Sequence, residues 1–116
     1  MQVAINDAGS IATVKLTGKL DISGAGAVEM PLATLSGAKN GLVIDLSEVT
    51  FIASIGIRHL VAANRALARR GGRVILLNPS DAVTDVLTTA GVSEILQIAR
   101  SEAEARAAAA PSGAAS

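Results

Sequence analysis

The chain has 116 residues, with ten basic and ten acidic side chains, no cysteine, no tryptophan or tyrosine and one phenylalanine. This length suits one domain with an aliphatic core, and the absence of cysteine excludes disulfides and thiolate metal sites. Zero net charge and the lack of aromatic side chains for base stacking argue against nucleic-acid binding. No apolar run approaches the roughly 18 residues of a membrane span, and the N-terminus lacks a signal-peptide pattern, so we expect a cytoplasmic protein.

The first 18 residues predict a β-hairpin. Residues 2–7 and 10–18 are short runs with partial alternation and β-branched side chains. The sequence DAGS, residues 7–10, overlaps their ends and has the composition of a turn. Lys15 and Lys19 are expected to face water.

A Gly-rich loop and then a helix are predicted after the hairpin. Val28, Leu32 and Leu35 recur at helical spacing. Pro31 either disturbs this helix or lies in its first turn, and the Asn-Gly pair at 40–41 marks its end.

The middle of the chain predicts a buried strand followed by an amphipathic helix. Residues 42–46 form a short apolar run with one Asp, and residues 49–53 extend or resume it. Ser54 is a candidate N-cap, and the glycines at 71–72 mark the end of the helix. One helical stripe is apolar apart from one Asn: Ile57, Leu60, Val61, Asn64, Leu67 and Ala68.

The last third alternates strands and helices. Residues 73–78 predict a second buried strand, and residues 79–91 a helix with Pro79 at its start and Gly91 past its end. Residues 95–99 predict a short strand, and residues 100–110 an Ala-rich helix.

These elements indicate an α/β fold. We expect a four- or five-stranded mixed sheet with about four helices, mostly packed on one face. The domain spans residues 1–110, and residues 111–116 form a disordered tail.

Five of the ten basic residues lie close together in the sequence, and no Asp or Glu occurs from Val49 to Ser80: the five are Arg58, Arg65, Arg69, Arg70 and Arg73. Either this is a solvated helix face or it meets an acidic partner surface.

Ser54 lies where a strand end meets a helix start, a common position for function in such sheets. The first N–H groups of a helix are unpaired and carry partial positive charge, so this corner suits a phosphate, bound or attached to a serine.

The sequence from IDLSEV through FIASIG to GGRVILLN resembles the central half of a STAS domain, the fold of bacterial anti-sigma-factor antagonists. The segment LTGKLD resembles the family's segment before its first helix, and the likeness covers about residues 2–105. It implies a STAS-like fold and a protein-binding switch. An unphosphorylated antagonist binds an anti-sigma factor, usually also a serine kinase, and so frees a sigma factor for transcription.

One departure from the family concerns that switch. The family's Asp falls on Ala53, its first Ser on Ser54, and its main phosphorylatable hydroxyl on Ile55. Three interpretations follow: an antagonist without a phosphate switch, a switch moved to Ser54 or less readily Thr50, or a STAS subunit of a lipid-transport or sensory, stressosome-like complex.

The partner-binding candidates come from the same resemblance: Asp21, Ser54, Ile55, Gly56, Arg58, Ala62 and Arg65. Ile55 is expected to be exposed and to anchor a partner.

A small serine hydrolase is the remaining alternative, but Ser54 and His59 are separated by about 140° around a helix and do not meet. No metal site or cofactor is predicted, since the Asp residues lack ligand spacing. A weak homodimer is possible.

Overall fold

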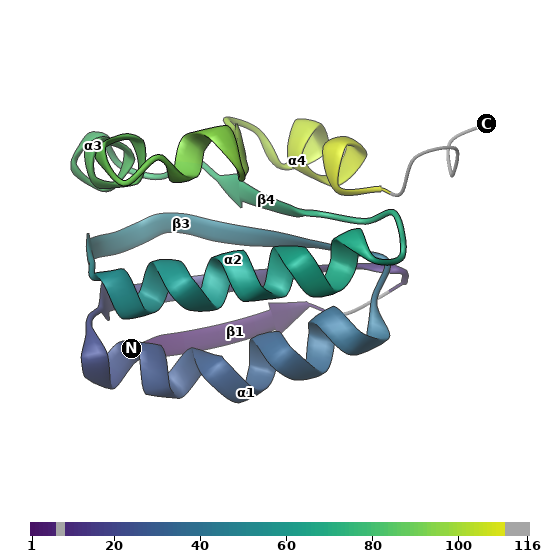
Figure 1. Cartoon of the computed structure of the whole chain (residues 1–116), viewed down its shortest axis with the longest axis horizontal. Helices are drawn as coiled ribbons and strands as arrows, with labels where there is room; N and C mark the ends of the chain where they lie inside the picture. Colours follow the sequence, from purple (N-terminus) through teal and green to yellow (C-terminus); the bar gives the residue numbers. More distant parts are fainter. Residues whose placement is uncertain (7–8, 111–116) are drawn as a thin grey trace.

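The computed structural model describes residues 1–6 and 9–110. In these residues five strands form one mixed sheet in the order β1-β2-β3-β4-β5 (Figure 1). β1 (Gln2–Asn6) pairs antiparallel with β2 (Ile11–Leu20), which confirms the hairpin. β3 (Gly41–Ile52), β4 (Val74–Leu77) and β5 (Gln97–Ala99) follow in parallel.

The structure confirms the α/β class and the mixed sheet. Residues 7 and 8 of the predicted turn and the predicted tail, residues 111–116, lie outside the described residues.

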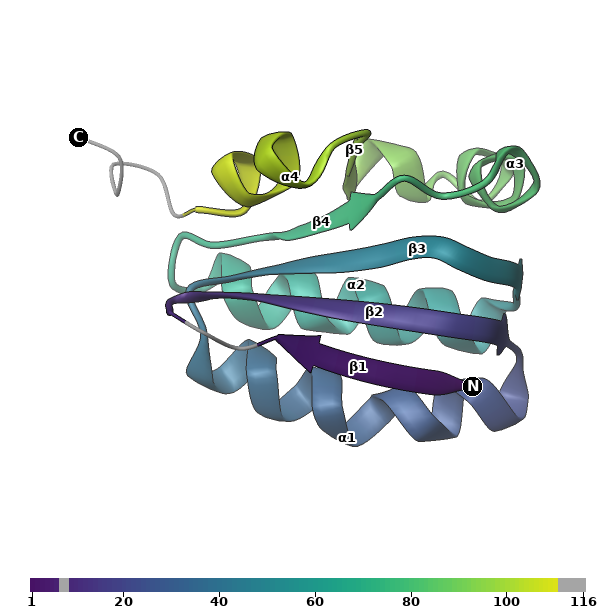
Figure 2. The same ribbon diagram turned by 180° about the vertical axis from the view of Figure 1, so that it is seen from behind.

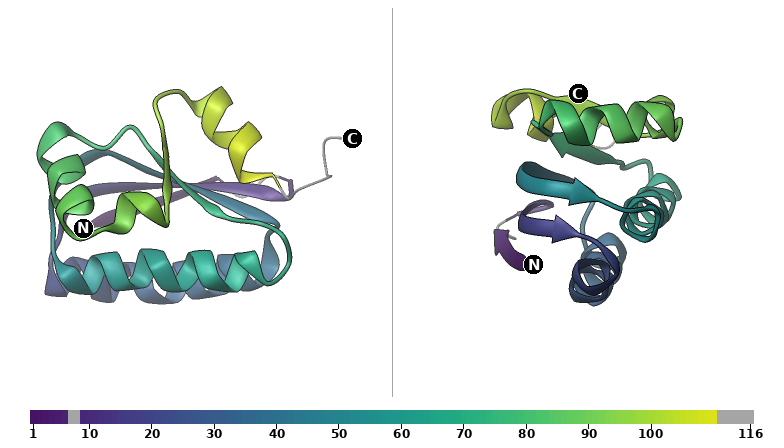
Figure 3. Two further views of the ribbon diagram at one scale, coloured as in Figure 1. Left: turned by 45° about the horizontal axis from the view of Figure 1, so that its top comes forward. Right: turned by 90° about the vertical axis from the view of Figure 1, so that its left-hand side faces the viewer.

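Four α-helices and one short 3₁₀ helix connect and follow these strands in the described part of the chain. They are α1 (Ile22–Ala38), α2 (Ser54–Ala68), α3 (Asp81–Thr89), η1 (Val92–Glu94) and α4 (Glu102–Ala109). α1 and α2 lie side by side on one face of the sheet, and the end-on view places α4 on the other (Figures 1 and 3). The strand predicted over residues 95–99 is shorter than expected. Residues 95 and 96 form a turn and a bend after η1, so only residues 97–99 pair with β4.

Two apolar clusters fill the two sides of the sheet. The larger lies between the sheet and α1, α2 and α3, and includes Val28, Leu60 and Leu87. The smaller lies under α4, where Ala105 and Ala109 pack with side chains of β2 to β5. All four residues of β4 are buried because both of its faces are covered, as its continuous apolar run predicted.

α4 is fixed to the sheet by one arginine. The Arg106 guanidinium donates to Thr13 Oγ1 at 3.1 Å and to the carbonyl oxygen of Ile11 at 3.3 Å. Seen from behind, β1 and β2 extend beyond the part of the sheet that α4 covers (Figure 2). This uncovered part carries the exposed side chain of Lys15, as expected; Lys19 is exposed too.

β3 is one strand of 12 residues rather than two, and it contains two irregularities. Opposite β2, three steps from Asp45 to Glu48 match two steps from Lys15 to Thr17, and a second slip follows after Val49. Each extra residue is a β-bulge that reverses the inside–outside alternation. Leu46, Val49 and Ile52 therefore all face the core although they are three residues apart.

The prediction of a Gly-rich loop before the first helix is wrong. α1 begins at Ile22, so Gly24 and Gly26 lie inside it, and Pro31 lies in its interior. The reason is a strong N-cap: Asp21 Oδ1 accepts a hydrogen bond from the Gly24 N–H at 2.9 Å. Such a cap stabilises a helix by about 1 kcal/mol, which offsets one helical glycine.

Candidate functional site

The ends of β2 and β3 bring two helix starts together at one edge of the sheet (Figure 1). The Ala53 N–H donates to the carbonyl oxygen of Leu20 at 2.9 Å, which joins the turn into α1 with the turn into α2. We call the surface formed by residues 21–22 and 51–58 the carboxyl edge. It unites Asp21 with the predicted corner at Ser54.

Asp21 is half-buried, and its Oδ1 accepts the hydrogen bond from the Gly24 N–H that caps α1. This structural role accounts for the residue without a partner. Asp21 nevertheless lies on the carboxyl edge, because the carbonyl oxygen of the preceding residue, Leu20, accepts the Ala53 N–H.

Ser54 is not the N-cap of α2, contrary to the prediction. The N-cap is Ala53, with extended backbone angles (φ −105°, ψ 167°), and Ser54 is the first helical residue. Ala53 has no side-chain acceptor, so no side chain caps the N–H groups of the first turn. By contrast, the caps of α3 and α4, Ser80 and Ser101, each accept a backbone N–H.

Restoring an acceptor at this position should stabilise the fold. We expect Ala53→Asp to raise the free energy of unfolding by about 1 kcal/mol, because an N-cap Asp accepts from the first turn and its charge favours the helix dipole. Urea denaturation followed by circular dichroism measures the change. Ser80→Ala is the reciprocal control, with a loss of similar size expected. An unchanged Ala53→Asp midpoint would contradict the uncapped start.

Ser54 and Ile55 face different sides of α2. Successive helical residues are about 100° apart. Ser54 is exposed and lines a groove toward α3, while Ile55 is half-buried and does not line that groove. Ile55 was expected to be exposed, and the structure shows it half-buried instead.

Gly56 is buried against β2. A Cβ at Gly56 would lie 2.5 Å from Leu20 Cγ and 3.1 Å from the Leu20 carbonyl oxygen. The absence of a side chain at Gly56 thus lets the start of α2 pack closely on the end of β2 at the carboxyl edge.

The groove between α2 and α3 has a volume of about 500 Å³ and was not predicted. Its lining is mostly apolar, with one carboxylate: Ile52, Ala53, Ser54, Ile57, Asp85, Val86, Thr89 and Ala90. Val86, an apolar residue of α3, is 40% exposed at this groove. An exposed apolar residue such as Val86 could have indicated this groove. The sequence alone, however, does not show which apolar positions of this helix are buried.

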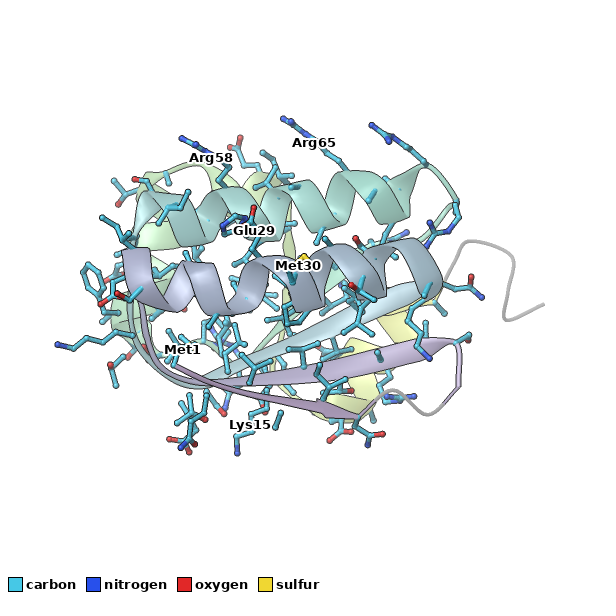
Figure 4. The ribbon with its side chains drawn as sticks, turned by 90° about the horizontal axis from the view of Figure 1, so that it is seen from below. Met1, Lys15, Glu29, Met30, Arg58 and Arg65 are labelled. Atoms are coloured by element: carbon cyan, nitrogen blue, oxygen red, sulfur yellow. The ribbon has the colours of Figure 1, made fainter. Side chains whose placement is uncertain are left out.

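One stripe of α2 faces solvent. Arg58, Ala62, Arg65 and Arg69 are all exposed, and the opposite side buries Leu60 and Leu67. Figure 4 shows Arg58 and Arg65 projecting from α2 away from the sheet. The Arg58, Arg65 and Arg69 guanidinium groups have no hydrogen-bond or ion-pair partner among residues 1–6 and 9–110.

His59 lies on the flank of α2 away from Ser54. It lines a second groove, between α1 and α2, whereas Ser54 lines the groove toward α3. The two side chains therefore do not form a nucleophile–base pair. The Asp45 carboxylate accepts hydrogen bonds from the Ser47 N–H and Oγ within β3.

Within the described residues, no three His, Cys, Asp or Glu side chains gather in a way that would hold a metal ion. None of the described helices has both the length and the apolar character needed to cross a bilayer.

The sheet order, the N-terminal hairpin and the helices on both faces define a STAS-like α/β domain. The family model of the STAS domain matches residues 2–105, and the chain belongs to this family.

Solved structures show the same fold. The anti-sigma factor antagonist SpoIIAA in its unphosphorylated form is 25% identical, with a TM-score of 0.78 over 90% of this chain and 93% of that one. The phosphorylated form of SpoIIAA from Bacillus is 24% identical, with a TM-score of 0.71 over 91% and 97%. An anti-sigma factor antagonist from Mycobacterium paratuberculosis is 22% identical, with a TM-score of 0.83 over 93% and 92%. No curated protein sequence matches the chain.

Proposed function

We propose that the chain is an anti-sigma-factor antagonist, which binds an anti-sigma factor or serine kinase of the bacterial type and so releases a sigma factor for transcription. The observation that carries the proposal is the likeness to SpoIIAA, at 25% identity over 90% of the chain, together with an exposed carboxyl edge where the family motif falls. Ser54 and Arg58 are exposed at this edge and therefore accessible to a partner.

The partner surface in this proposal has two parts. At the carboxyl edge, Ser54 and Ile55 offer the contacts, while Asp21 and Gly56 hold the two helix starts in place. Along α2, a stripe of exposed residues continues the surface: Arg58, Ala62 and Arg65.

The position of the phosphate switch differs from the family pattern. SpoIIAA has been described in unphosphorylated and phosphorylated forms. In this chain Ile55 has no hydroxyl, whereas Ser54 is exposed and its hydroxyl has no hydrogen bond within the described residues. Ser54 is the candidate phosphorylation site, and Thr50, also exposed, is the second choice.

The loss of the hydroxyl at Ile55 also favours a second function. The second function is that of a STAS subunit of a lipid-transport or sensory, stressosome-like complex, with a partner other than an anti-sigma factor. The partner distinguishes the two functions: a kinase-like anti-sigma factor belongs to the first, and a transport ATPase or a sensory scaffold to the second.

Co-purification with the tagged chain, followed by mass spectrometry, tests this function. We expect an anti-sigma factor to be retained, and we expect Ile55→Asp to weaken its binding about tenfold because a charge replaces a half-buried apolar contact. Ile55→Val is the matched control and should bind like the unmodified chain. Retention of a transport ATPase alone, or full binding by Ile55→Asp with its fold intact, would overturn the proposal.

A further inference from the structure

The helical face of the domain combines unpaired positive charge with exposed apolar side chains. Arg58, Arg65 and Arg69 stand on α2 with no partner among the described residues, and no carboxylate occurs in the chain from Val49 to Ser80. On the neighbouring helix α1, Ile22 is 81% and Met30 73% exposed. One side of this face is therefore basic and the other apolar.

A shallow groove of about 360 Å³ runs between the two helices. Small residues of both helices, Ala33 of α1 and Ala62 and Ala66 of α2, line it. Because these side chains are short, an element resting there can reach Met30 on one side and the arginines on the other. Figure 4 shows Met30 on α1 and both Arg58 and Arg65 on α2 at this face, with Lys15 on the opposite side of the domain.

One carboxylate faces this groove. Glu29 lies on α1 and lines the groove together with His59 of α2. The negative charge is thus on the α1 side, and the three unpaired arginines are on the α2 side. An occupant with acidic groups must place them over α2.

We propose that this face docks an acidic amphipathic helix of a partner protein. The apolar stripe of that helix would contact Met30 and the alanines that line the groove, and its carboxylates would lie over Arg58, Arg65 and Arg69. The choice of occupant rests on charge complementarity. A nucleic acid would offer no apolar stripe for Met30 and Ile22. The proposal rests on the proposed function in one respect: this helix belongs to the partner that also contacts the carboxyl edge.

The absence of Trp and Tyr from the chain gives a clean assay. The probe is an 18-residue helical peptide with a Leu/Ala stripe, a Glu stripe and one Trp, whose fluorescence comes from the peptide alone. A second peptide carries Gln in place of each Glu. We expect the Glu peptide to bind at least tenfold more tightly than the Gln peptide and to weaken as salt rises, since exposed charges are screened over about 8–10 Å at 0.1–0.15 M salt.

Variants of the domain assign the binding to this face. Arg65→Glu and Ala62→Leu should each weaken binding of the Glu peptide tenfold or more, the first by charge reversal and the second by filling the groove. Glu29→Gln should strengthen it about twofold. Lys15→Glu is the matched control, a charge reversal on the other side of the domain, and should bind like the unmodified chain.

Several outcomes would overturn the docking surface: equal binding of the Glu and Gln peptides, no binding, or Lys15→Glu weakening binding as much as Arg65→Glu. Binding that instead follows self-association of the domain in sedimentation would assign the face to a second copy and overturn it as well. The peptide assay uses no anti-sigma factor. A failure of the co-purification with the tagged chain is therefore distinguishable from a failure of the docking surface.

Discussion

Replacing Gly24 with alanine is expected to lower the free energy of unfolding by about 2 kcal/mol or more. An added Cβ would lie 2.1 Å from the carbonyl oxygen of Lys19, a backbone atom of β2. The strand end cannot retreat, because Leu20 next to it accepts the Ala53 N–H and packs against Gly56. The strain therefore exceeds the gain of about 1 kcal/mol that alanine brings to a helix.

Gly26→Ala is the matched control for this prediction. It lies two residues further along the same helix, and no atom lies within 4 Å of its added Cβ. We expect it to raise the free energy of unfolding by about 0.5–1 kcal/mol. Thermal unfolding of both variants by circular dichroism measures opposite shifts. Two shifts of the same sign would contradict the close approach of α1 to β2.

The elements that were predicted correctly are those with a strong local pattern. The apolar run of β4 and the capped helix α3, with Ser80 before it and Gly91 after it, carry their own signals in a few adjacent residues. The interior position of Gly24 and Gly26 carried no such signal. It depends on the cap at Asp21 and on the space left by β2, neither of which is visible in a glycine-rich sequence.

The N-cap of α2 shows why a boundary can be wrong by one residue. Serine is a far better cap than alanine, so local preference selected Ser54. The structure places the cap at Ala53 because the Ala53 N–H is held by Leu20, a contact across the sheet that fixes where the strand ends. The bulges of β3 arise in the same way, from pairing with β2 rather than from the sequence of β3.

Only those parts of the candidate site that are made of residues close together in the sequence were predicted. The corner from Ala53 to Gly56 and the stripe of Arg58, Ala62 and Arg65 follow from a strand, a helix and a resemblance. The groove that Ser54 lines also needs α3, which faces α2 across it only because β4, the strand before α3, lies next to β3. Predicting a groove between elements that are far apart in the sequence requires knowledge of the strand order in the sheet.

A negative charge at Ser54 is expected to weaken binding of the anti-sigma factor at least tenfold. The hydroxyl stands at a mostly apolar groove that already contains the carboxylate of Asp85. A phosphoserine adds a charge of about −1.5 to −2, and a partner that covers the groove would have to bury part of that charge beside Asp85, where no residue of the groove lining is cationic. Ser54→Glu reproduces part of this effect, and titration calorimetry with the purified anti-sigma factor measures it.

Two further variants separate charge from size and position. Ser54→Gln has the size of glutamate without the charge and should bind within about threefold of the unmodified chain, since an uncharged amide at the groove rim stays hydrated. Ser93→Glu places the same charge on η1, in the pocket at the far end of α2, and should not affect binding. If Ser54→Gln binds as weakly as Ser54→Glu, the groove excludes bulk rather than charge, and phosphate at Ser54 is not an electrostatic switch. If Ser54→Glu binds like the unmodified chain, the partner does not cover the groove.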